Sequence, residues 1–173
     1  EKIGYVPQKG ILFSGDIESN LRYAKEDATA QEIAEAARIA QATEIIEAKP
    51  EKYATPISQG GTNVSGGQKQ RLSIARALVK RAEIYIFDDS FSALDFKTDA
   101  KLRTELNKMI RETQATVLLV AQRISSIMHA DRIVVLDKGR VAGIGTHEEL
   151  MESCEVYQEI AYSQLSKEEL GNE

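Results

Sequence analysis

The feature that most constrains the fold is a pair of apolar runs separated by a long amphipathic segment. Ile84–Phe87 and Thr116–Ala121 contain no charged residue. Such runs are typical of parallel strands that are buried on both faces. Between them, Asp95 is predicted to cap a helix whose apolar stripe consists of Leu102, Leu106, Met109 and Ile110. The strand–helix–strand order predicts an α/β fold with a parallel sheet.

The first part of the chain is predicted to be mainly helical. Thr29 is followed three residues later by Glu32, which is the pattern of a capping box. Ser65 precedes a second amphipathic segment with helical spacing. We therefore expect a mainly helical part over residues 14–81, and further strands with C-terminal helices over residues 82–173.

Composition excludes several classes of protein. Hydrophobic residues make up 42% of the 173 residues, as in a soluble globular protein. The net charge is -5, so the chain lacks the excess of basic residues expected of a protein with a nucleic-acid partner. A single cysteine, Cys154, cannot form an internal disulfide and fits a reducing compartment. The sequence contains no apolar run of transmembrane length and no signal peptide. Because it starts at Glu1 within a predicted strand, we expect a piece of a longer protein.

The sharpest motif is Val64-Ser65-Gly66-Gly67-Gln68, directly before a predicted helix. Adjacent glycines let another group approach the backbone closely. The unpaired N–H groups of a first helical turn, together with the helix dipole, favour an anion such as phosphate. Taken alone, Ser65-Gly66-Gly67 is also typical of an ordinary helix start, and for these three residues by themselves we prefer that interpretation.

A second motif, Asp88-Asp89, places two carboxylates at the end of a predicted buried strand. Ligands of open α/β sheets collect at that edge, and one such Asp can hold Mg²⁺. The alternative is a pair of loop acids that cap the next turn. Asp95 works simply as a helix cap, and Gln8 on its own is an exposed loop residue.

Two apparent motifs are rejected. Gly10 and Gly15 have the spacing of a phosphate loop, but Asp16 stands where the lysine is needed. His147 begins a zinc-protease pattern, but Met151 replaces the second histidine.

The ordered set of motifs resembles the nucleotide-binding domain of ATP-binding-cassette (ABC) exporters. Gln8 resembles the glutamine-loop residue, and Asp88 the Walker B aspartate; the resemblance implies that both contact Mg²⁺. Asp95 resembles the aspartate of the D-loop. The resemblance assigns the signature motif, which contacts ATP, to Ser65, Gly66, Gly67 and Gln68. It implies a partial P-loop NTPase core with a helical signature subdomain over residues 14–81, and Walker B and switch elements over residues 82–173.

Three departures from the family pattern concern the chain's own ATP site. The Walker A loop lies upstream of Gln8 in the family and is absent from this sequence. Asp89 stands in place of the catalytic glutamate and is one methylene shorter, although a base must reach its proton to within about 3 Å. Gln122 replaces the switch histidine and cannot take a positive charge.

The intact signature and the changes at Asp89 and Gln122 together resemble one subunit of a heterodimeric bacterial multidrug exporter. The resemblance implies an ATPase in the full-length protein that drives transmembrane efflux by ATP-dependent dimer closure, with its own site degenerate and the isolated fragment inactive. It implies ATP and Mg²⁺ as cofactors, a position at the cytoplasmic face of the cell membrane, and two partners. These partners are the transmembrane domain, which Ile11–Ser14 is expected to face, and a second nucleotide-binding domain on another chain.

Alternatives remain open at this point. A soluble ABC ATPase of DNA repair or translation is disfavoured by the acidic charge and by the short route to the signature. A non-catalytic regulatory module is partly supported by Asp89 and Gln122, and a phosphate-binding α/β protein outside the family is remote. Exposed sheet edges also predict artificial pairing between copies of the chain.

Overall fold

The computed structural model describes the backbone of residues 2–170 and the side chains of residues 2–164. The chain divides into two compact units, Glu1–Val120 and Ala121–Glu173. No helix within the described residues is long and apolar enough to cross a membrane.

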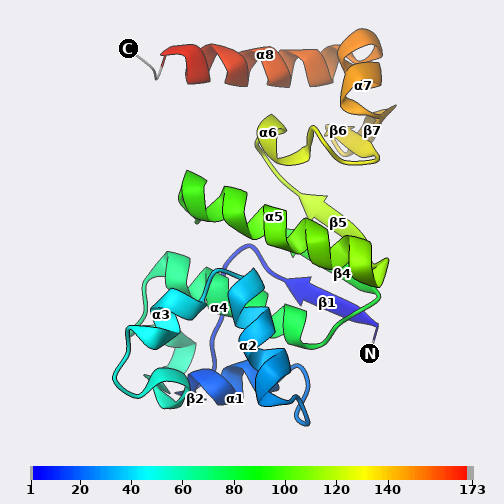
Figure 1. Ribbon diagram of the computed structural model, residues 1–173. Helices are drawn as coiled ribbons and strands as arrows, with labels where there is room; N and C mark the ends of the chain where they lie inside the picture. Colours follow the sequence, from blue (N-terminus) through cyan, green and yellow to red (C-terminus); the bar gives the residue numbers. More distant parts are fainter. Residues whose placement is uncertain (1, 171–173) are drawn as a thin grey trace. The chain divides into compact units, whose positions relative to one another are not determined.

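A three-stranded parallel sheet organises the first unit (Figure 1). The strands are β1 (Ile3–Val6), β4 (Ile84–Asp88) and β5 (Thr116–Val120), and β4 lies between the other two. Tyr5 pairs in register with Ile86, which pairs with Leu118. The predicted parallel sheet is confirmed, and its strands place their carboxyl ends at one edge.

One face of this sheet is covered and the other is open. Tyr85 and Phe87 are buried in a core that also contains Leu78 of α4 (Gly66–Val79) and Leu102 of α5 (Phe96–Thr113). On the opposite face, Leu118 is 51% exposed. The prediction that both apolar runs form strands buried on both faces is wrong for the described residues. Successive side chains point to opposite faces, and helices cover only one of them.

Short helices fill the sequence between β1 and α4. The elements are β2 (Gly15–Asp16), α1 (Ile17–Arg22), α2 (Ala30–Ile39), α3 (Thr43–Glu47), η1 (Lys52–Ala54), β3 (Pro56–Ile57) and η2 (Gln59–Gly61). β2 and β3 pair antiparallel. The capping box predicted at Thr29 is present at the start of α2, and Ser65 caps α4 with a second capping box.

The second unit contains a β-hairpin and, in its described part, three helices. It comprises α6 (Ile124–Ile127), β6 (Ile133–Asp137), β7 (Arg140–Gly145), α7 (His147–Ser153) and α8 (Glu155–Leu170). The core side chains are Ile133, Val135, Leu150, Cys154 and Tyr157. Cys154 is buried and forms no disulfide.

Candidate functional site

Three of the predicted site residues meet at the carboxyl ends of β1 and β4. Gln8 follows β1, and its Nε2 donates a hydrogen bond to Asp89 Oδ2 at 3.3 Å. Asp88 is the last residue of β4, and its Oδ2 accepts from the Tyr5 hydroxyl at 3.3 Å. Loss of hydration, followed by the charge of Asp88, raises the pKa of Tyr5. Two carboxylates and an amide from distant parts of the sequence thus share one edge of the sheet.

Asp89 is held firmly at the turn after β4. Its φ of 47° is left-handed, a conformation that aspartate tolerates better than most residues. Its N–H donates to the Val120 carbonyl at 2.9 Å, and its carbonyl accepts from the Ser92 hydroxyl at 2.9 Å. The residue is buried, with 9% of its surface exposed. The carboxylate therefore has a fixed starting point, and its reach depends on side-chain length.

The predicted signature residues form the exposed N-terminus of α4. Ser65 Oγ accepts from Gln68 N at 3.3 Å, and Gln68 Oε1 accepts from Ser65 N at 3.1 Å. This reciprocal cap leaves the N–H groups of Gly66 and Gly67 without an acceptor among the described residues. A Cβ added to Gly66 would meet nothing within 4 Å. The described residues therefore give no steric reason for glycine at this position.

The segment before α5 lies beside this helix tip. A Cβ added to Gly67 would lie 3.5 Å from the carbonyl oxygen of Ala93. Asp95 caps α5: Oδ1 accepts from Thr98 N at 2.9 Å, and Oδ2 accepts from the Thr98 hydroxyl at 2.7 Å. These bonds, led by the hydroxyl bond, lower the pKa of Asp95, and the charge of Arg71 adds to the effect. Asp95 thus acts as the predicted cap while it remains exposed near the signature helix.

Gln122, the fourth predicted site element, belongs to the second unit. Its carbonyl accepts a hydrogen bond from Gln164 Nε2 of α8 at 2.6 Å. Gln164 Oε1 in turn accepts from Ile124 N at 2.7 Å. The side chain of one C-terminal helix residue therefore holds the backbone on both sides of residue 123.

Sequence reasoning missed the side chains that hold the site together. The local sequence around Tyr5 and Gln70 is typical of an ordinary strand and an ordinary helix and does not indicate that these side chains contact the site. Ser90 is fully buried, and its Oγ donates to the Val6 carbonyl at 2.9 Å. Gln70 Oε1 accepts from Gly10 N, 60 positions away, and Ser90 lies 84 positions from Val6. No local spacing pattern indicates contacts over such separations.

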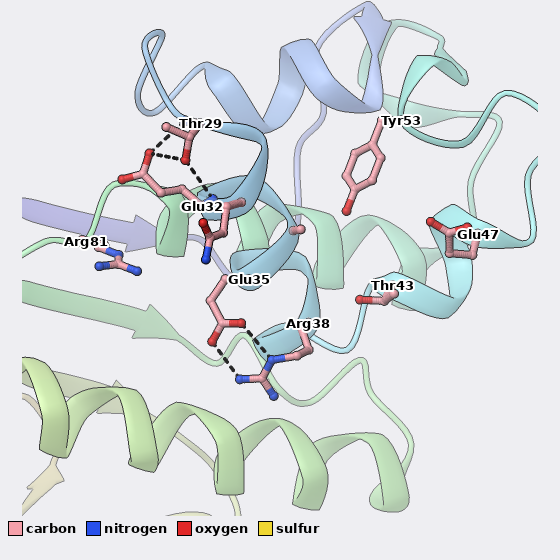
Figure 2. A pocket seen from close by; sticks show the side chains of 10 residues that line it. Thr29, Glu32, Glu35, Arg38, Thr43, Glu47, Tyr53 and Arg81 are labelled. Carbon is pink, nitrogen blue, oxygen red and sulfur yellow. Dashed lines mark hydrogen bonds and ion pairs between the residues drawn. The ribbon is translucent and has the colours of Figure 1, made fainter.

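Other polar groupings do not form a comparable site. No group of three or more His, Cys, Asp or Glu side chains in the described part of the chain is placed to hold a metal. His147 Nδ1 lies 2.8 Å from the Tyr157 hydroxyl. Figure 2 shows a polar hollow beside α2 where Glu35 pairs with Arg38, and Glu32 with Thr29. None of its lining residues belongs to the candidate site.

Comparison with known proteins identifies the family. The family model described as "ABC transporter" matches residues 1–92, which is more than half of the chain. The chain belongs to the ABC transporter family. An uncharacterized ABC transporter ATP-binding protein of Mycobacterium tuberculosis is 45% identical over 172 residues, covering 98% of this chain and 29% of the relative. The mitochondrial iron-sulfur clusters transporter ATM1 of Chaetomium globosum is 40% identical, covering 94% of this chain and 27% of that protein.

A solved structure supports the same placement at the level of the fold. A bacterial Atm1-family ABC exporter with ATP bound matches with a TM-score of 0.89 and 34% identity, over 95% of this chain and 29% of that one. The ABC chain described here therefore has the P-loop NTPase fold of an exporter's nucleotide-binding domain. It spans about 29% of the length of such relatives.

Proposed function

We propose that this chain is the signature-bearing part of an ABC exporter's nucleotide-binding domain and that it takes part in ATP-driven transport. Its signature grips ATP held by a second nucleotide-binding domain, and its own ATP site hydrolyses slowly. The family membership and the likeness to an exporter support the general role. The finer assignments rest on the named residues.

The open helix tip carries the proposal. Two N–H groups and a serine hydroxyl gather at the positive end of a helix of 14 residues. Gly66 keeps this end unobstructed although glycine is a poor helix former. A phosphate group that approaches from another chain finds donors there and no side chain in the way. Gly66 and Gly67 then bind the outer phosphate through their N–H groups, and Ser65 through its hydroxyl.

The test replaces Gly66 in the full-length transporter with its partner subunit. Gly66→Leu introduces a good helix former into open space, so we expect no loss of thermal stability. The new side chain fills the approach to the helix tip, so ATP turnover should fall about 100-fold, as when anion-binding donors are lost in other active sites. ATPase rate and thermal unfolding are measured together.

The matched control is Ala34→Leu, which adds a leucine to an exposed position on α2. We expect wild-type turnover from this variant. If Gly66→Leu also retains wild-type turnover and transport, the signature does not grip nucleotide and the proposed function is wrong.

The donor set beside β4 fits Mg²⁺. Carboxylate and amide oxygens are hard ligands of the kind that this ion takes, usually with few protein ligands and several waters. Asp88 is the residue proposed to hold it, with Gln8 contributing its amide oxygen. When bound, Mg·ATP supplies the phosphoryl group and the cation that neutralises its charge. The chain's residues orient it and hold the water.

The proposed weakness of the chain's own site rests on two residues. Asp89 would attract the proton of the attacking water, but its carboxylate starts from a fixed turn and is shorter by one methylene than glutamate. Gln122 can donate a hydrogen bond to phosphate but cannot become positively charged. A site with both changes is expected to bind nucleotide and turn it over slowly.

An intact signature beside a weak site favours a heterodimer, in which the signature serves a competent site on another chain. Single-site turnover in the assembled transporter tests this arrangement. Equal hydrolysis at both sites contradicts it. Nucleotide binding without any turnover at either site would support the alternative of a regulatory module.

We propose that Ile11–Ser14 faces the transmembrane domain at the cytoplasmic side of the membrane. Ile11 and Phe13 are 53% and 42% exposed in a segment that follows the glutamine loop.

The transported compound is proposed to be a drug-like molecule. The relative named as an iron-sulfur clusters transporter makes an iron–sulfur cluster the second candidate cargo. Stimulation of ATPase activity by each class of compound distinguishes the two.

A further inference from the structure

Gln70 is a buried amide whose two polar atoms are both used on one loop. It lies in α4, two residues after the signature, and is 2% exposed. Its Oε1 accepts from Gly10 N at 2.8 Å, and its Nε2 donates to the Pro7 carbonyl at 3.3 Å. One side chain thus closes the ends of the loop that contains Gln8.

The same loop is fixed from other directions. The Ser90 hydroxyl, next to Asp89, donates to the Val6 carbonyl at 2.9 Å. Gly10 lies so close to α4 that an added Cβ would stand 2.9 Å from Ser73 Oγ and 3.0 Å from the Lys69 carbonyl. Between these fixed ends, the side chain of Gln8 stays exposed and reaches Asp89.

We propose that Gln70 is a positioning residue that holds Gln8 over Asp89 and ties the glutamine loop to the signature helix. This inference rests on the proposed function. Because α4 carries the signature at its tip and the loop on its side, a shift of the helix moves Gln8 with it. The grip on a partner's nucleotide is thereby linked to the Mg²⁺ ligands of the chain's own site.

The chemistry of the contact demands an amide of this length. Pro7 has no N–H and offers only a carbonyl, whereas Gly10 offers an N–H. A glutamate at position 70 keeps the acceptor for Gly10 but sets a carboxylate against the Pro7 carbonyl. A methionine keeps the shape and loses both hydrogen bonds.

Asn20 provides a matched control on the same segment. It is 3% exposed in α1, and its Oδ1 accepts from Phe13 N at 2.8 Å while its Nδ2 donates to the Phe13 carbonyl at 2.9 Å. It therefore holds residue 13 by the same chemistry but is anchored on another helix. Asn20→Asp removes a donor just as Gln70→Glu does.

The experiment uses the full-length transporter with Gln70→Met, Gln70→Glu, Gln8→Ala, the Gln8→Ala/Gln70→Met double variant and Asn20→Asp. Hydrogen exchange of peptides covering residues 7–13 reports the loop directly. We expect exchange at Gly10 to become about 3- to 10-fold faster in Gln70→Met, which removes the acceptor of the Gly10 N–H, and to change less in Gln70→Glu, which keeps that acceptor. In Asn20→Asp, exchange at Gly10 should stay at the wild-type rate.

The functional readout is the Mg²⁺ concentration that gives half-maximal single-turnover hydrolysis at the chain's own site, with the partner's site inactivated. We expect Gln70→Met and Gln8→Ala each to raise it about tenfold, as for other residues that orient metal ligands. The double variant should show no further change, because Gln70 acts through Gln8. Asn20→Asp should leave it unchanged.

Three results would overturn the inference. They are unchanged exchange at Gly10 in Gln70→Met, an unchanged Mg²⁺ requirement in that variant, and effects that multiply in the double variant. A wild-type transporter without ATP turnover would instead refute the proposed function, and the exchange measurement would still decide whether Gln70 holds the loop.

Discussion

At the scale of single residues, the role proposed for Asp89 depends on one methylene. Its backbone is fixed by Val120 and Ser92, so the side chain cannot move forward to compensate for its length. Gln8 already donates to its carboxylate at 3.3 Å. The position is therefore well ordered, and we propose that an aspartate there is too short to act as the base.

We predict that Asp89→Glu alone raises turnover at the chain's own site by no more than about tenfold. With Gln122→His added, the gain should approach about 100-fold, the lower range of full acid–base catalysis. The reason is that length restores reach, while only histidine supplies a charge. Single-turnover hydrolysis with the partner's site inactivated measures both. Full recovery by Asp89→Glu alone would contradict the role given to Gln122.

At the scale of elements, α2 begins with a cap that is also an ion pair. Glu32 Oε2 accepts from Thr29 N at 2.8 Å, while Lys25 Nζ lies 2.7 Å from Oε1 (Figure 2 shows the cap). These contacts, with Lys25 first, lower the pKa of Glu32 from 4.5 to about 2. The carboxylate form is thus favoured by folding.

We predict a stability difference for Glu32→Gln that depends on pH. The amide can still cap the helix but loses the pair with Lys25, so the variant melts at a slightly lower temperature at pH 7. Because the folded pKa lies below the unfolded value, this contribution is complete above about pH 4.5 and fades toward pH 2. Thermal unfolding from pH 7 to pH 3 measures the gap. A gap that stays constant with pH would refute the explanation.

Segment 11–14 is the second element with a testable surface. The ring of Phe13 lies 4.5 Å from that of Tyr23 and under the Arg76 guanidinium at 5.0 Å, with the Arg76 Nη2 atom donating to the Ile11 carbonyl. This holds an apolar ring in place while 42% of Phe13 stays exposed.

We predict that Phe13→Ala reduces cargo-stimulated ATPase activity about fivefold or more, as for a central contact of an interface, with basal activity nearly unchanged. Reconstituted full-length transporter provides the measurement. Tyr162→Ala, at an exposed aromatic residue of α8, is the control. Unaltered stimulation in Phe13→Ala would exclude this segment as the contact with the transmembrane domain.

At the scale of the whole molecule, the exposed apolar face of the sheet is the feature that most favours association between copies of this 173-residue chain. Ile3, Tyr5, Leu118 and Val120 are each about half exposed on the same face. β1 and β5 also form the edges of the sheet and present unpaired backbone groups. An apolar face with open edges favours association.

We predict that the 173-residue chain, expressed alone, self-associates and binds a hydrophobic dye. Light scattering and dye fluorescence measure these properties. Leu118→Lys should at least halve dye binding, because it places a charge at the centre of the face. A dye-silent monomer at high concentration would contradict the prediction.

The sequence by itself determined the local features of this protein. The helix starts at Thr29, Ser65 and Asp95 were predictable because a cap and its partner lie within three residues of each other. The apolar runs predicted parallel strands, and the ordered motifs identified the family. The meeting of Gln8 with Asp89, the hold of Gln70 on that loop and the covering of only one sheet face were decided by the tertiary structure. Each depends on contacts between residues far apart in the chain, which no local periodicity records.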